Sequence, residues 1–123
     1  RHEAEGIVER EAWLRAGEAG MLCPTVPEAY GGYGLDFRFN AIVAEEASYA
    51  GSAVGWSLQS DIVADYILAY GSEEQKKKWL PRMVTGEAIT AIAMTEPGAG
   101  SDLQGMKTIA RKSGNGWRLS GSK

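Results

Sequence analysis

The feature that most constrains this chain is a short apolar run that ends in a loop of very small residues. Residues 88–94 are apolar and partly β-branched, which predicts a buried strand. Pro97 forces the preceding Glu96 into an extended conformation and cannot continue a ladder, so the strand should end there. Residues 98–100 carry almost no side chain, so their backbone N–H groups can approach an anion closely, and Ser101 adds a hydroxyl donor. A phosphate group fits such a loop.

Two standard phosphate-binding motifs do not match this loop, and a plain turn without a ligand stays open. The dinucleotide fingerprint G-x-G-x-x-G would need a glycine where Leu103 stands, followed by a long helix. A P-loop would need its lysine one residue before Lys107. The residues that follow predict two short strands instead, around 108–110 and 117–119, joined by a turn of Asn115 and Gly116.

Four helices are predicted ahead of the loop. The first spans about residues 7–18, and the second begins after Asp36, a suitable N-cap. The third, about 52–70, is apolar around most of its circumference, which predicts the central helix of a bundle. The fourth begins at Ser72, which forms a capping box with the glutamine three residues later. Pro81 is predicted to kink or end this helix.

Composition excludes several classes of function. A net charge of −3 and a pI near 5.2 leave no basic surface for nucleic acid, and no apolar segment approaches the roughly 20 residues of a membrane span. Cys23 is the single cysteine, so an internal disulfide is impossible, and its apolar neighbours predict a packed thiol. No metal site is expected, and Asp61 and Asp65 are predicted to lie on a solvated edge or cap a helix.

Four motifs, in order and at matching spacing, resemble those of the acyl-CoA dehydrogenase family. They occupy residues 26–36, 71–81, 93–105 and 119–123. The segment 93–105, AMTEPGAGSDLQG, resembles the signature that opens the middle β-domain of that family. The resemblance covers nearly the whole chain, and residues 60–64 together with 101–105 resemble the long-chain branch most.

The resemblance implies a mainly α fold, with an N-terminal helical bundle followed by the first strands of a middle β-barrel-like domain. It places an incomplete helical domain at residues 1–86 and a truncated β-domain at residues 87–123. The chain begins without methionine and ends directly after a predicted strand, so we expect a fragment of a longer protein. The resemblance further implies a homotetramer when full length, in the bacterial cytoplasm or, in a eukaryote, the mitochondrial matrix.

The activity implied by the resemblance is FAD-dependent α,β-dehydrogenation of fatty acyl-CoA thioesters to trans-2-enoyl-CoA, with electron transfer flavoprotein as the electron acceptor. Two alternatives stay open: a flavin-dependent acyl-CoA oxidase of the same superfamily, and a non-catalytic helical interaction module. The sequence leaves the preferred length of the acyl chain undetermined.

Site residues are implied by position in the matching motifs. Contacts to FAD are implied for Ile92, Ala93, Met94, Thr95, Gly100 and Ser101. Contacts to the substrate are implied for Ser101, Gly55, Leu58, Gln59 and Ile62. The family's catalytic glutamate lies in its C-terminal domain, so we expect no catalytic residue here and no activity from the fragment alone. Glu96 is expected to orient backbone N–H groups beside the loop.

Overall fold

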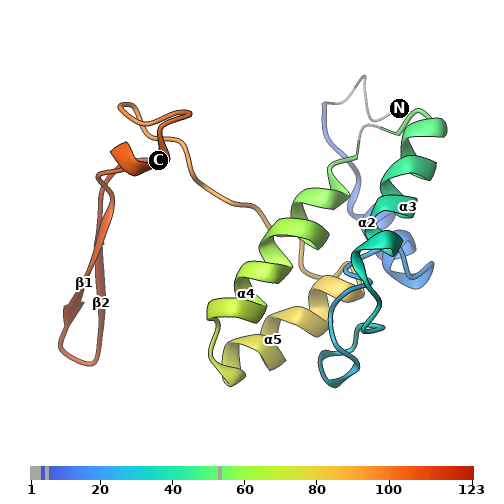
Figure 1. Cartoon of the computed structure of the whole chain (residues 1–123), viewed down its shortest axis with the longest axis horizontal. Coiled ribbons are helices and arrows are strands. Elements are labelled where there is room, and N and C mark those ends of the chain that lie inside the picture. Colours follow the sequence, from blue (N-terminus) through green and yellow to red (C-terminus); the bar gives the residue numbers. More distant parts are fainter. Residues whose placement is uncertain (1–3, 5, 53) are drawn as a thin grey trace. The chain divides into compact units, whose positions relative to one another are not determined.

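The computed structural model describes residues 4, 6–52 and 54–123. The chain divides into two compact units, Arg1–Ala91 and Ile92–Lys123. The described helices of the first unit, labelled in Figure 1, are α2 (Arg10–Glu18), α3 (Phe37–Tyr49), α4 (Ala64–Tyr70) and α5 (Glu73–Val84). A π-helical segment, Leu58–Val63, precedes α4, and short 3₁₀ turns lie at Glu28–Tyr30 and Leu103–Gly105. The expected mainly α fold, with a short β element near the end of the sequence, is confirmed.

Both predicted helix caps are confirmed. The Asp36 carboxylate accepts a hydrogen bond from the Arg38 backbone N–H at 3.0 Å, where α3 begins. At the start of α5, the Gln75 N–H donates to the Ser72 hydroxyl (3.2 Å) and the Ser72 N–H donates to the Gln75 side-chain oxygen (2.8 Å). Each bond satisfies a donor that the helix itself leaves unpaired, which fixes where the helix begins.

Pro81 was predicted to kink or end the last helix, and it does not end it. Helix α5 continues through Pro81 to Val84. Proline removes one backbone donor, but Leu80, Met83 and Val84 around it are buried, and their packing outweighs a single missing bond. The Pro81 carbonyl still accepts from the Thr85 N–H at 3.1 Å, so the helix closes normally after the proline.

The third predicted helix begins later and is less buried than expected. It begins at Trp56 rather than near residue 52, and it widens into the π-helical segment before α4. A π turn holds one more residue than an α turn. Here the consecutive residues Gln59 and Ser60 are both buried, while Leu58 and Ile62 are 37% and 39% exposed. The helix therefore packs on one side and leaves an apolar strip exposed on the other.

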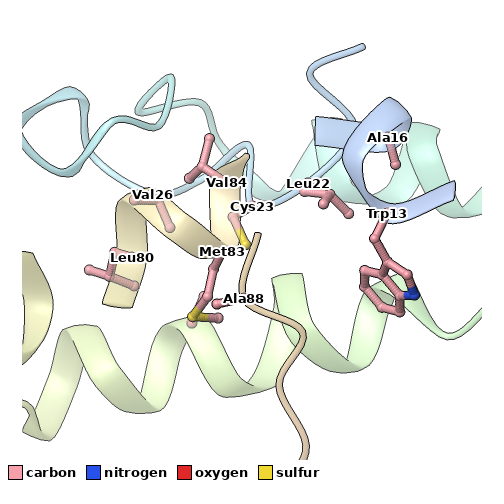
Figure 2. Close-up of a cluster of buried hydrophobic side chains, with 10 residues drawn as sticks. Trp13, Ala16, Leu22, Cys23, Val26, Leu80, Met83, Val84 and Ala88 are labelled. Atoms are coloured by element: carbon pink, nitrogen blue, oxygen red, sulfur yellow. The ribbon is translucent and has the colours of Figure 1, made fainter. Parts of the chain in front are cut away.

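The core of the first unit joins α2, the loop after it, and α5 (Figure 2). Leu22, Cys23 and Val26 from the loop are completely buried, as are Leu80 and Met83 from α5. Trp13 and Ala16 extend the cluster along α2, and Ala64 adds a contact from α4. This packing fixes the end of α5, from which the chain continues toward the glycine-rich loop.

The buried thiol of Cys23 gives a direct test of this core. Burial raises the pKa of Cys23 from 9.0 to about 11, although the Ser60 hydroxyl acts in the opposite direction. This rise reduces the thiolate fraction at neutral pH about a hundredfold, and burial also blocks access by a reagent. We expect a disulfide reagent to label Cys23 at least about a hundredfold more slowly in native buffer than in denaturant. Equal labelling rates in the two solutions would contradict the packing described here.

The second unit contains the predicted hairpin. Strands β1 (Ile109–Ser113) and β2 (Gly116–Ser120) are antiparallel, and Ser113 lies opposite Gly116. The two turn residues are therefore Gly114 and Asn115, not Asn115 and Gly116 as predicted. Gly114 has φ 57°, and a glycine at the first turn position is what a type II′ turn requires.

The predicted buried strand at residues 88–94 is absent. Within the described residues, no other segment pairs with it in a ladder, and a strand needs a neighbour to bond its N–H and C=O groups. The Thr90 N–H donates instead to the side chain of Gln59. Ala88 is buried, but Ile89 and Met94 are 43% and 37% exposed.

Candidate functional site

Residues 92–95 begin the second unit with a largely unpaired backbone. In the part of the chain that the structure describes, the N–H groups of these four residues donate no hydrogen bond. Their one bonded carbonyl is that of Met94, which accepts from the Lys123 ammonium at 2.9 Å. A row of free donors and acceptors of this kind suits the polar edge of a planar ligand.

The loop that follows is held closed at its base and open at its tip. Glu96 and Ala99 exchange two backbone hydrogen bonds, of 2.9 and 3.1 Å. The N–H groups of Gly98, inside that bridge, and of Gly100 and Ser101, after it, donate to no group among the described residues. A side-chain carbon added at Gly98 or Gly100 would meet nothing within 4 Å. Free amides beside open space fit the predicted contact with a phosphate group.

Asp102 closes the loop by starting the next turn. Its carboxylate accepts from the Gln104 N–H at 3.1 Å, which begins the 3₁₀ turn Leu103–Gly105. This bond directs the carboxylate toward the following turn.

Glu96 anchors the loop to the hairpin. Its carboxylate accepts from the N–H groups of Lys107 (2.7 Å) and Thr108 (3.0 Å) and lies 3.1 Å from the Lys123 ammonium. The residue is only 9% exposed. The predicted role of Glu96, holding backbone N–H groups, is confirmed, whereas the ion pair with Lys123 was not predicted because the two residues are far apart in sequence.

These contacts determine how the loop responds to acid. The Thr108 side chain, followed by the backbone N–H of Lys107 and then the other contacts, lowers the pKa of Glu96 from 4.5 to about 2. A carboxylate whose pKa is depressed on folding stabilises the folded state above its unfolded pKa. That contribution is lost as the pH falls through the folded pKa. The contribution of Glu96 is therefore complete above pH 4.5 and disappears on acidification toward pH 2.

Replacing Glu96 with glutamine is expected to remove this pH dependence. In the wild type, the amide resonances of Lys107 and Thr108 should titrate near pH 2, and in E96Q they should not titrate. The D102N variant, which alters the other carboxylate of the loop, should keep the wild-type titration. A wild-type midpoint near 4.5, the ordinary value, would contradict the geometry at Glu96.

Of the predicted substrate contacts, Leu58, Gln59 and Ile62 lie in the π-helical segment of the first unit, Gly55 directly precedes that helix, and Ser101 lies in the second unit. Leu58 and Ile62, four residues apart, expose apolar side chains, and Gly55 borders open space. Gln59 differs from them because it has no exposed surface. Its amide N–H donates to the Met83 carbonyl at 3.0 Å, and its oxygen accepts from the Thr90 N–H at 3.0 Å.

Sequence reasoning missed this internal role of Gln59. The available signal was an amide side chain in a nearly continuous apolar helix, since a buried polar group is normally hydrogen-bonded. The predicted contacts to FAD, at residues 92–95, 100 and 101, all lie in the second unit. These assignments stay predictions, as do those of Gly55, Leu58, Gln59 and Ile62.

Two kinds of feature are absent from the described residues. No helix among them combines the length and apolar character that crossing a membrane requires. No three histidine, cysteine, aspartate or glutamate side chains among them gather as a metal site.

Comparison with known proteins gives a consistent family pattern. Residues 1–87 match the family described as acyl-CoA dehydrogenase, N-terminal domain. The chain is 53% identical over 122 residues to the protein named long-chain specific acyl-CoA dehydrogenase, mitochondrial, from Sus scrofa. The matching region covers 98% of this chain and 28% of that protein.

Solved structures show the same similarity. An acyl-CoA dehydrogenase from Geobacillus kaustophilus superposes with a TM-score of 0.88 at 53% identity, covering 97% of this chain and 32% of the other. An acyl-CoA dehydrogenase from Bacillus anthracis, complexed with FAD, gives a TM-score of 0.77 at 45% identity, covering 91% of this chain and 20% of the other. The chain thus spans a third or less of the length of these relatives.

Proposed function

Because this chain belongs to the acyl-CoA dehydrogenase family, we propose that the whole protein is an FAD-dependent acyl-CoA dehydrogenase. It would convert fatty acyl-CoA thioesters to trans-2-enoyl-CoA, and two long-chain specific members are 53% and 50% identical to this chain. The observation that carries the proposal is the segment 92–101, in which the N–H groups of residues 92–95, 98, 100 and 101 bond no group among the described residues, and Gly98 and Gly100 border open space. This chain would supply part of the flavin site and part of the substrate site.

The residues of the second unit would bind and orient the cofactor. FAD, when bound, supplies a hydride acceptor. The backbone of residues 92–95 would run along the edge of the flavin ring, with the Thr95 hydroxyl directed at its polar rim. Gly100 and Ser101 would hold the pyrophosphate through their N–H groups, which are free in this structure. The Ser101 hydroxyl would also contact the thioester.

The residues of the first unit would contact the acyl chain. Leu58 and Ile62 supply exposed apolar surface, and each buried CH₂ of a substrate contributes roughly 0.8 kcal/mol. Gly55 leaves space beside them. We assign Gln59 a different role from the predicted contact, because its buried amide can act only through Met83 and Thr90.

The base that removes the α proton would come from elsewhere in the protein. Glu96 is a carboxylate beside the loop, but its contacts lower its pKa to about 2, which makes it a weak base at neutral pH. Its oxygens are also occupied by Lys107, Thr108 and Lys123. We therefore propose that this chain positions ligands and carries no catalytic residue.

The proposed arrangement of the whole protein follows that of its family. Residues 1–86 would belong to a helical domain and residues 87–123 to the middle β-domain; a division into two parts is supported by the change of unit, which the structure places five residues later, after Ala91. The full-length protein would form a homotetramer and pass its electrons to electron transfer flavoprotein. Relatives occur both in mitochondria and in a bacterium, so the proposed compartment is the mitochondrial matrix or the bacterial cytoplasm according to the source.

Product analysis of the full-length protein tests this proposal against its alternatives. With a long-chain acyl-CoA, we expect trans-2-enoyl-CoA to accumulate when electron transfer flavoprotein is present, and little product when air is the sole oxidant. Rapid turnover in air with release of hydrogen peroxide would identify an oxidase instead. A colourless protein without turnover would favour an interaction module.

A further inference from the structure

The ammonium group of Lys123 contacts residues on both sides of the glycine-rich loop. It lies 2.9 Å from the Met94 carbonyl oxygen, 3.1 Å from the Glu96 carboxylate and 3.1 Å from the Met106 sulfur. Met94 and Glu96 precede the glycines of the loop, and Met106 follows the 3₁₀ turn that closes it. An ammonium has three N–H donors, so these three acceptors match its full capacity. Lys123 therefore joins the two ends of the loop.

Close packing of the backbone after β2 brings Lys123 to this position. Gly121 has φ 151°, and a side-chain carbon added there would lie 2.1 Å from the Thr108 hydroxyl oxygen and 2.6 Å from its Cα. Glycine permits this approach because it has no such carbon. Lys123 follows two residues later, and its side chain is 28% exposed, beside a Glu96 side chain that is 6% exposed. A charged hydrogen bond in such a partly buried place is stronger than an ion pair in open solvent.

The bond from Lys123 is also the single hydrogen bond that the backbone of residues 92–95 makes within the described part of the chain. Further along the second unit, the next backbone anchor is Glu96, which exchanges two hydrogen bonds with Ala99. A segment with so few bonds can adopt several backbone conformations. Fixing one of them before a ligand arrives lowers the entropy cost of binding that ligand. The contact with Met94 places Lys123 where it can do this.

We propose that Lys123 is a positioning residue for FAD. It holds the Met94 carbonyl and the base of the loop, so that the free backbone groups of residues 92–95 keep one arrangement for the cofactor. Lys123 acts through Met94 and Glu96, and it is distinct from the predicted contacts to FAD. The inference rests on the proposed function and extends the set of residues on which its cofactor site depends.

Positive charge by itself also attracts an anionic cofactor, so the control must remove a charge without removing these contacts. Residues 92–123 carry five basic and two acidic side chains, a net charge of +3. Lys107 belongs to the same unit, and its side chain bonds no group among the described residues. Its backbone N–H bonds Glu96, and a substitution of the side chain leaves that bond in place. K107M is therefore the matched control for K123M.

Titration of the full-length apoprotein with FAD measures the effect of each substitution. We expect K123M to weaken FAD binding about tenfold, and K107M to weaken it less than about twofold, in samples whose circular dichroism matches the wild type. The visible absorption band of the bound flavin should also shift in K123M and not in K107M, because the backbone along the ring is held differently. A role confined to stability would lower the unfolding temperature without changing the affinity or the spectrum.

Methionine methyl NMR of the same apoproteins tests the contact without the cofactor. The variants M94L and M106L assign the two resonances in the full-length protein. We expect both resonances to shift in K123M, because the ammonium contacts both residues, and to keep their wild-type positions in K107M.

Three results would overturn the inference. Equal losses of FAD affinity in K123M and K107M would show that the positive charge acts from any position. Unchanged affinity and absorption in K123M would show that Lys123 does not position the cofactor, and unmoved methyl resonances would show that it does not hold Met94. A wild type that binds no FAD contradicts the proposed function and the inference together, whereas a wild type that binds FAD beside an unaffected K123M contradicts the inference alone.

Discussion

Replacing Gln59 with leucine is expected to destabilise the helical unit by about 2 to 4 kcal/mol, one of the two largest effects that the structure predicts. The side chain is fully buried and bonds the Met83 carbonyl, the Thr90 N–H and the Thr90 hydroxyl, at 3.0, 3.0 and 3.3 Å. Leucine fills a similar volume but leaves partners of the amide without a bond inside the protein. Denaturant unfolding gives the loss in stability. Amide hydrogen exchange at Thr90 shows whether the hydrogen bond from Thr90 to Gln59, which we call the clamp, has opened.

The S60A variant is the matched control for Gln59. Ser60 is the next residue of the same π-helical segment and is also buried, but its hydroxyl accepts from the Cys23 N–H at 2.9 Å and has no bond to Thr90. We expect S60A to lower the free energy of unfolding. The Thr90 amide should then still exchange through global unfolding, without a faster local opening. If Q59L and S60A accelerate exchange at Thr90 equally, Gln59 is an ordinary core residue and does not clamp this segment.

Replacing Gly86 with alanine is expected to cost about 3 to 5 kcal/mol, because it combines backbone strain with a collision. Gly86 follows α5 with φ 77°, a conformation that side chains other than glycine rarely adopt. An added side-chain carbon would also lie 2.1 Å from the Trp13 carbonyl oxygen of α2, far inside contact distance. Relief of this collision requires α2 and the end of α5 to separate, and thermal or denaturant unfolding measures the cost.

The G51A variant isolates the backbone contribution. Gly51 has a similar φ of 68°, but an added side-chain carbon there would meet nothing within 4 Å. Alanine at this position should therefore cost only about 1 kcal/mol. Equal losses in G51A and G86A would show that α2 does not approach Gly86 as closely as the structure indicates.

Local signals in the sequence predicted the local elements well. The caps at Asp36 and Ser72 act over two or three residues, and two short strand-like runs around an Asn-Gly pair are sufficient to predict a hairpin, although its turn lies one residue earlier. The prediction of a strand at residues 88–94 was wrong, because strand formation depends on a distant partner that local composition does not specify. Helix α5 does not end at Pro81, one of the two outcomes predicted, for a related reason: the packing that retains the proline in the helix comes from other parts of the chain.

The site shows the same division between local and distant information. The small residues of the loop and the contact of Glu96 with backbone amides follow from the local sequence. The clamp from Gln59 to Thr90 and the ion pair from Glu96 to Lys123 join residues about 30 positions apart, so periodicity gave no sign of either. The residues of the loop alone predicted only that an anion binds there. The identity of the cofactor as FAD came from the resemblance to a family.

Anaerobic addition of a long-chain acyl-CoA to the full-length, FAD-loaded protein tests the central claim most directly. The flavin absorbance at about 450 nm should be lost in a single turnover, with one equivalent of trans-2-enoyl-CoA formed per flavin reduced. A protein that binds FAD but keeps this absorbance unchanged with acyl-CoA substrates of short, medium and long chain length would contradict the assignment as an acyl-CoA dehydrogenase.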